Sequence, residues 1–220
     1  MAYTVKEIFY TLQGEGMNAG RPAVFCRFSG CNLWTGRESD RHRAVCQFCD
    51  TDFVGVGPDG GRYGEAFMLA QAVLDRWPER RDGRAVGGRP LVVCTGGEPL
   101  LQLDEPAIRA LHAVGFEIAV ETNGTQPAPQ GIDHVCVSPK ADAPLVLTQG
   151  QELKLVYPQS HPSAQPERFA GLRFDTFFLQ PMDVADRTIS QANVRAALEY
   201  CLAHPQWRLS LQTHKLLDIR

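Results

Sequence analysis

Residues Leu91-Val92-Val93-Cys94-Thr95-Gly96-Gly97-Glu98-Pro99 join a short apolar run to a turn that contains two glycines. Such a run predicts a buried strand. Paired glycines let the backbone approach a ligand closely, and their exposed amide and carbonyl groups can hold an amino-acid head group. Most Gly-Gly pairs only turn the chain, however. The segment therefore predicts a strand, and its function depends on what lies near it.

Similar apolar runs recur on both sides of this segment, separated by glycine and proline. Near-continuous apolar strands are typical of a parallel sheet that is covered on both faces. Helical periodicity, with apolar residues three and four positions apart, occurs in residues 64–77, 104–114 and 189–202. The sequence thus predicts alternating strands and helices. The further strands are expected at residues 23–28, 117–121, 134–138, 153–157, 176–180 and 208–212.

Only a linker rich in proline and glycine joins the strands predicted at 117–121 and 134–138. It is marginal for a parallel crossover and leaves no room for a good helix. The order of elements therefore predicts an α/β fold, a βα-barrel with helices missing, whose site lies at the carboxyl ends of the strands. The length of 220 residues and the 44% hydrophobic content predict a single domain, residues 1–220, around one core.

Composition favours a protein that acts on a small molecule. The net charge of −3, without a long run of lysine or arginine, gives no electrostatic footprint for nucleic acid. The first seven residues lack a charged head followed by an apolar run, and no apolar stretch approaches the roughly 20 residues of a membrane span. We therefore expect no membrane contact and a cytoplasmic location.

Cys31, Cys46 and Cys49 form a C-x14-C-x2-C pattern within a total of seven cysteines. An odd, uneven set in a chain of this length argues against a disulfide framework and favours metal-ligating thiolates. Three thiolates leave one iron of a [4Fe-4S] cube free to bind a small molecule. A zinc knuckle with a fourth ligand such as His42 fits the spacing nearly as well. The remaining cysteines, predicted to be small buried hydrophobes, are Cys26, Cys94, Cys136 and Cys201.

The cysteines and the glycine turn together resemble the radical S-adenosylmethionine (SAM) enzymes. The segments on which this resemblance rests are residues 29–34, Cys46-Gln47-Phe48-Cys49-Asp50 and Gly96-Gly97-Glu98-Pro99. The usual superfamily spacing is C-x3-C-x2-C, but here Thr35 stands where the second cysteine falls and residues 36–45 enlarge the loop. An enlarged cluster loop is a known variation among the 7-carboxy-7-deazaguanine synthases.

Other segments spread over nearly the whole chain are similar to the same family. The combination of Leu-Gln-Gly-Glu-Gly with Cys-Asp-Thr is specific. The resemblance implies an abridged (β/α) partial TIM barrel of the radical SAM type, with several helices missing. The matching segments are residues 10–16, 49–51, 121–124, 137–140 and 212–215.

The resemblance implies a carbon–nitrogen lyase of queuosine-type purine biosynthesis. Its substrate is 6-carboxy-5,6,7,8-tetrahydropterin, and ring contraction with loss of ammonia gives 7-carboxy-7-deazaguanine. The reduced cluster splits SAM, and the resulting 5′-deoxyadenosyl radical takes hydrogen from C6 and later returns it. The protein mainly orients the reactants and excludes competing reactions.

By family match, SAM chelates the open iron and is bound near the cluster loop, the glycine turn and two later strand ends. Lys140, just past a strand end and fixed by Pro139, is expected in this site rather than on the surface. The expected cofactor-binding residues are Phe48, Cys49, Asp50, Gly97, Ser138, Pro139, Lys140, Gln180, Pro181, Met182 and Asp183.

A flat pterin with a carboxylate calls for amide groups and one cation. Arg27 can clamp a carboxylate in two-pronged fashion, and Gln13 supplies an amide. Glu15 is either a base or an acceptor for the guanidine-like edge, or simply a solvated charge, and is not assigned. The expected substrate-binding residues are Leu12, Gln13, Gly14, Arg27, Thr95 and Arg220, the last through its terminal carboxylate.

The family also places a magnesium ion at the position of Thr51, which directly follows the cluster loop. Mg²⁺ prefers oxygen ligands and keeps several waters, so one protein ligand suffices. The expected partners are an external electron donor, flavodoxin-like or ferredoxin-like, and a second copy of the chain in a homodimer. Two alternatives remain: an activase that installs a glycyl radical on another protein, and a zinc-stabilised binding module.

Overall fold

The structure is a computed structural model that describes residues 2–78 and 89–220. Within these ranges a nine-stranded sheet has the order β3-β1-β2-β4-β5-β6-β7-β8-β9. From β2 onward all neighbours are parallel, whereas β1 is antiparallel to both β2 and β3. The strands are β1 (Tyr3–Leu12), β2 (Pro22–Phe28), β3 (Gly61–Tyr63), β4 (Leu91–Gly96), β5 (Glu117–Thr122), β6 (His134–Val137), β7 (Gln149–Tyr157), β8 (Arg173–Pro181) and β9 (Trp207–Leu209).

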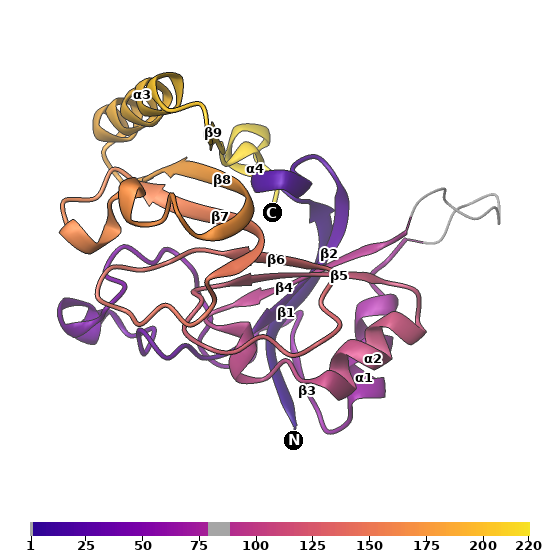
Figure 1. The fold of residues 1–220 in the computed structure, drawn as a ribbon. Coiled ribbons are helices and arrows are strands. Elements are labelled where there is room, and N and C mark those ends of the chain that lie inside the picture. The colour runs from indigo at the N-terminus through magenta and orange to yellow at the C-terminus, as the bar shows by residue number, and fades with distance from the viewer. Residues whose placement is uncertain (1, 79–88) are drawn as a thin grey trace.

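The helices are few, and the three longest cover one face of the sheet. In Figure 1, α1 and α2 lie side by side at one end of the sheet, while α3 lies beside β8 and β9 at the other. The chain passes from β5 to β6 without a helix, as predicted, and the connection from β6 to β7 also lacks one. The helices are α1 (Ala66–Leu74), α2 (Glu105–Ala113), α3 (Arg187–Ala203) and α4 (Thr213–Leu217), and the 3₁₀ turns are η1 (Gly16–Asn18), η2 (Glu38–Arg43), η3 (Pro99–Leu101), η4 (Pro162–Ala164) and η5 (Pro166–Arg168).

The three predicted helices occur within a few residues of their expected bounds. Aspartates begin two of them: the Asp104 carboxylate accepts a hydrogen bond from the Ala107 amide (3.0 Å), and Asp186 accepts one from the Thr188 amide (2.8 Å). A short acceptor side chain at this position satisfies amides that the first helical turn leaves unpaired. Across the described ranges, none of these helices has the length and apolar character that crossing a membrane requires.

Two apolar clusters hold the helices on the sheet. One lies between α1, α2 and strands β1 to β5, with Phe28, Phe116 and Ile118 fully buried. The other lies between α3 and strands β6 to β9. On the opposite face a smaller apolar group fills only the amino-terminal half of β2, β4 and β5. Beyond it that face turns polar, so the prediction of a sheet covered on both faces is wrong for the carboxyl half of the strands.

The sequence did not predict β1 and β3, and it extended the last strand too far. β1 carries Lys6 and Glu7, which line the inner cavity and interrupt the apolar pattern. The last strand ends at Leu209 rather than at residue 212. Its continuation turns toward the N-terminal loop, where the Ser210 hydroxyl accepts a hydrogen bond from the Gly16 amide (3.0 Å) and the Thr213 amide donates to the Gly14 carbonyl (3.0 Å).

Candidate active site

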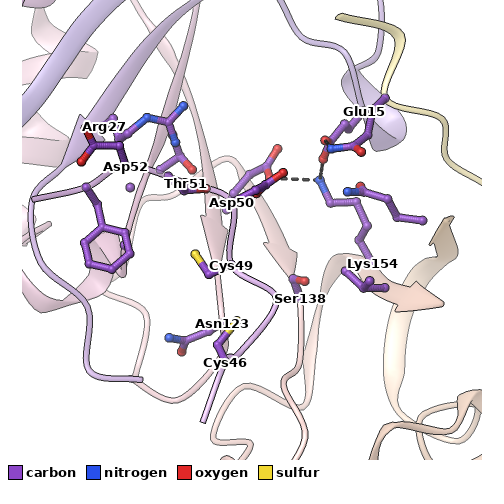
Figure 2. Close-up of a pocket in the computed structure, with 18 of the residues that line it drawn as sticks. Glu15, Arg27, Cys46, Cys49, Asp50, Thr51, Asp52, Asn123, Ser138 and Lys154 are labelled. Atoms are coloured by element: carbon purple, nitrogen blue, oxygen red, sulfur yellow. Dashed lines mark hydrogen bonds and ion pairs between the residues drawn. The ribbon is translucent and has the colours of Figure 1, made fainter. Parts of the chain in front are cut away.

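The carboxyl ends of the parallel strands surround a cavity of about 510 Å³. Figure 2 shows residues from distant parts of the chain projecting into it. Pro139 is the exception among the predicted site residues: it lines a neighbouring pocket of about 250 Å³ that shares Asn123 and Lys140 with the cavity. The predicted residues that line the cavity are Leu12, Gln13, Gly14, Arg27, Cys31, Cys46, Phe48, Cys49, Asp50, Thr51, Thr95, Gly97, Ser138, Lys140, Gln180, Pro181, Met182, Asp183 and Arg220.

Three thiols form one wall of the cavity. Cys31 follows β2, and Cys46 and Cys49 follow the enlarged loop that contains η2. A hydrogen bond from the Cys46 thiol lowers the pKa of Cys49 to about 6, against the opposing effect of burial, and the Thr51 amide adds a second hydrogen bond. The pKa of Cys46 is raised by the same bond. One thiolate is therefore available near neutral pH, which metal ligation requires.

The donor set fits an iron–sulfur cluster. Three soft thiolates on one wall of a cavity suit such a cluster and leave room for a small molecule on the open side. His42, the fourth ligand of the zinc interpretation, is exposed on η2 and is absent from the cavity lining. Among residues 2–78 and 89–220, no three histidine, cysteine or acidic side chains stand close enough to hold a single metal ion.

The two glycines after β4 pack against the cluster loop. A side chain on Gly97 would collide with the Gly30 carbonyl and with the Cys31 β-carbon. Gly96 has φ of +143°, and a side chain there would meet the Phe28 backbone. The Glu98 amide donates to the Gly30 carbonyl (2.9 Å). The glycine turn is therefore required for close packing under the first cluster cysteine, whatever else it binds.

Glu98, at the end of this turn, is fully buried and ties β4 to β5. Its carboxylate accepts hydrogen bonds from the Thr122 hydroxyl (2.7 Å) and from the amides of Asn123 (2.8 Å) and Leu100 (3.0 Å). Burial raises the pKa of Glu98, although these hydrogen bonds oppose the rise. The Asn123 side chain in turn donates to Asn32 (3.0 Å), next to the first cluster cysteine. The strand ends and the cluster loop are thus held in one hydrogen-bonded network.

The residues predicted to bind SAM gather beside the thiols. Lys140 folds back, and its ammonium donates to the Ser138 carbonyl and hydroxyl, both at 2.7 Å. Asp183 and Asp50 both form salt bridges with the Lys215 ammonium, at 2.7 and 3.4 Å. The buried Oε1 of Gln180 lacks a hydrogen-bond partner in the described part of the chain. An unsatisfied buried acceptor in a cavity wall is a candidate ligand contact.

The predicted substrate residues line the cavity on the side of β1 and β2. Arg27 donates from Nε to Glu7 (2.8 Å). The Arg220 guanidinium also pairs with Glu7 (2.6 Å) and lies over the Phe9 ring, 4.5 Å from its centroid. Its backbone oxygen accepts a hydrogen bond from the Thr11 hydroxyl (2.9 Å). The C-terminus therefore reaches this wall.

Sequence reasoning missed a buried ion cluster opposite the thiols. Lys154, only 4% exposed, lies within β7 and pairs with Glu15 (2.5 Å) and Glu121 (3.0 Å). Gln13 donates to the second oxygen of Glu121 (2.8 Å), and Gln212 to the second oxygen of Glu15 (3.0 Å). The available signal was a lysine in the apolar run Leu153-Lys154-Leu155, since a fully buried lysine is rare unless it is paired. We call Glu15, Glu121 and Lys154 the inner ion cluster.

Comparison with known proteins gives relatives in sequence and in structure. No protein-family model matches the sequence. The chain is 64% identical over 220 residues to the 7-carboxy-7-deazaguanine synthase of Caulobacter vibrioides and 60% identical over 220 residues to that of Bordetella pertussis, with 100% of each chain covered. It also resembles the crystal structure of QueE from Escherichia coli, with a TM-score of 0.69 and 29% identity over 96% of this chain and 94% of that one.

These matches cover all or nearly all of the chain, and they test the predicted fold class and family. The predicted fold class is confirmed by the mainly parallel sheet with few helices and by its likeness to QueE. The resemblance drawn from the cysteine loop and the glycine turn is confirmed by the relatives. The chain belongs to the 7-carboxy-7-deazaguanine synthase family, and it is an enzyme.

Proposed function

We propose that the cavity converts 6-carboxy-5,6,7,8-tetrahydropterin into 7-carboxy-7-deazaguanine with loss of ammonia, with the cofactors on one wall and the substrate on the other. Family membership supports this radical SAM lyase function in the queuosine pathway, and it decides against the glycyl-radical activase and the zinc-stabilised module. The observation that carries the proposal is the shared cavity: the three thiols and the Arg27 side chain line the same space.

The family implies an iron–sulfur cluster and SAM as cofactors. When bound, they supply the 5′-deoxyadenosyl radical. We assign Cys31, Cys46 and Cys49 as the cluster ligands. Gly97 provides a backbone surface without a side chain beside them. We assign the wall that contains Ser138, Lys140 and Gln180 to Asp183 to SAM, because its unsatisfied Gln180 acceptor and its cationic Lys140 suit an amino acid and a sugar.

We assign the wall around β1 and β2 to the substrate. Among the described residues Glu7 engages only Nε of Arg27, so the terminal nitrogens can bind the substrate carboxylate in two-pronged fashion. Thr95, opposite Arg27 in the β2–β4 register, adds a hydroxyl. Thr51 lines the same cavity as the thiols and Arg27, and we propose it as the one protein ligand of a Mg²⁺ ion that also contacts the substrate.

The chain acts in a small-molecule pathway. We further propose an external electron donor of flavodoxin or ferredoxin type, a homodimer, a cytoplasmic location and no nucleic-acid partner. The electron donor follows from the implied cluster chemistry, and the homodimer is proposed because two-fold dimers are the commonest oligomers. The near-neutral net charge supports the absence of a nucleic-acid partner.

The test is an anaerobic reaction of the iron-loaded protein with 6-carboxytetrahydropterin, SAM and a reductant, followed by mass detection of the product. We expect 7-carboxy-7-deazaguanine and ammonia, and a brown protein before reaction. Magnesium is titrated in the same assay. A colourless protein, or an iron-loaded protein that makes no product, would overturn the proposal.

A further inference from the structure

The inner ion cluster brings one cation and two carboxylates together from three elements. Glu15 follows β1, Glu121 lies near the end of β5, and Lys154 lies in β7. β5 and β7 are not neighbours, because β6 separates them. The lysine must therefore reach across the inner face of β6 to meet both acids. A contact that spans three elements sets their relative positions.

The charges of the inner ion cluster do not balance. Two carboxylates and one ammonium leave the wall with one excess negative charge. Among residues 2–78 and 89–220, each of these carboxylate oxygens has a single donor. Lys154 donates to one oxygen of each acid, while Gln212 and Gln13 donate to the others. A carboxylate oxygen can accept more than one hydrogen bond. The wall therefore presents acceptors with spare capacity to the cavity.

Electrostatics lowers the pKa of Glu15 and raises that of Lys154, although both groups are buried. Burial favours the neutral form of Glu15, but the Lys154 ammonium and the Gln212 hydrogen bond bring its pKa below the ordinary value. Burial likewise disfavours the charged lysine, but Glu121 and Glu15 hold the pKa of Lys154 well above its usual range. Glu152 and Cys136 also face Lys154 from β7 and β6.

We propose that Lys154 is a positioning residue, which fixes Glu15 and Glu121 as a pair of acceptors for the N–H-rich edge of the substrate ring. This inference rests on the proposed function. An N–H edge complements carboxylate acceptors, whereas the substrate carboxylate is repelled by this wall and directed toward Arg27. In the described residues the Lys154 ammonium donates to these two acids, and it acts through them.

The fold contains separate anchors for the turn that carries Glu15. The Thr213 amide donates to the Gly14 carbonyl (3.0 Å), and the Met17 amide donates to Glu152 (3.0 Å). Loss of the lysine should therefore free the acids without releasing the whole turn. A matched control ion pair exists outside the cavity: Arg21 binds Glu117 through two hydrogen bonds of 3.0 and 2.9 Å.

The experiment compares Lys154→Met with Arg21→Met in the reconstituted enzyme. It measures substrate KM and kcat, iron content, and 5′-deoxyadenosine formed without substrate. For Lys154→Met we expect KM to rise by about 10- to 100-fold, the effect of losing one hydrogen bond to a charged group. Iron content and substrate-free SAM cleavage should stay at the wild-type level. Arg21→Met should leave all four quantities unchanged.

A second variant covers the case in which Lys154→Met does not fold. Lys154→Met with Glu121→Gln removes one charge of each sign, so folding should recover while the raised KM persists. An unchanged KM in either folded variant overturns the inference, and so does a loss of iron and SAM cleavage in step with turnover, which marks a purely structural lysine. A wild-type enzyme without product instead refutes the proposed function.

Discussion

The cluster loop and the inner ion cluster face each other across one cavity but are built differently. In the loop, residues 30–53, several contacts are local: Arg41 donates to the carbonyls of Gln47 and Cys49 (both 2.9 Å) and lies over the Trp34 ring. The inner ion cluster instead joins Lys154 to acids 33 and 139 positions away. One wall is encoded by a short motif, whereas the other exists only in the folded sheet.

Because of this difference, we expect the order of the two regions to depend differently on cofactor and substrate. Three thiols of the cluster loop are assigned as cofactor ligands, so we expect this loop to gain order when its cofactor binds. The inner ion cluster has its partners already, so we expect it to be formed before substrate binds. Substitutions in the two regions should therefore separate cofactor effects from substrate effects.

The largest expected effect is at the cluster ligands. Cys46→Ala should abolish iron binding and turnover together, because only three protein thiolates are available. Cys31→Ala and Cys49→Ala should behave alike. Cys201→Ala is the matched control, since Cys201 lies on α3 and is not among the residues that line the cavity. Iron analysis and absorption spectra of the four proteins check this. An intact cluster in Cys46→Ala would remove it from the ligand set.

Arg27→Lys should give the next largest effect. Lysine keeps the charge but cannot form the two-pronged contact with a carboxylate. We expect substrate KM to rise by about 10- to 100-fold, with the cluster intact and substrate-free SAM cleavage retained. Steady-state kinetics at matched iron content measure the change. Unchanged substrate kinetics, or loss of the cluster, would count against the assignment.

Thr51→Ala should have a smaller effect that depends on magnesium. Removing one oxygen from an ion that keeps most of its waters should weaken binding rather than abolish it, so excess Mg²⁺ should partly restore product formation. The colour of the protein should not change. The measurement is product formation against Mg²⁺ concentration for both proteins at equal iron content. Superimposable curves would show that Thr51 is not a magnesium ligand.

The smallest expected effect is on stability in acid. The pKa of Glu15 is lowered in the folded protein, so its ionised form stabilises the fold above the ordinary value near 4.5. This stabilisation is lost as the pH falls through the folded-state pKa. Glu15→Gln should therefore lose about 1 to 3 kcal/mol at pH 7 and less at pH 3. Glu152 has a shift of the same sign and remains in both proteins.

Urea unfolding at the two pH values measures this difference. The wild-type protein and Glu15→Gln should converge in unfolding free energy toward pH 3. A constant gap between them across this range would show that the charge of Glu15 does not contribute.

The comparison of the two walls also explains what the sequence could reveal. The cysteine loop, the glycine turn and the polar strand ends were predictable because their spacing is local. Lys6, Glu7 and Lys154 were not, because each interrupts an apolar strand pattern in order to face the cavity. That interruption hid β1 and left the inner ion cluster unassigned. A polar residue within an apolar strand is readable in sequence, but its partners depend on strand order and register.

The central claim is that one cavity carries cofactor chemistry on one wall and substrate binding on the other. The most direct measurement is product and 5′-deoxyadenosine quantified together in anaerobic reactions of wild type, Cys46→Ala and Arg27→Lys. We predict both compounds from wild type, neither from Cys46→Ala, and 5′-deoxyadenosine with little product from Arg27→Lys. Iron-loaded wild-type protein that forms no 7-carboxy-7-deazaguanine, or an equal loss of both compounds in Arg27→Lys, would contradict the account.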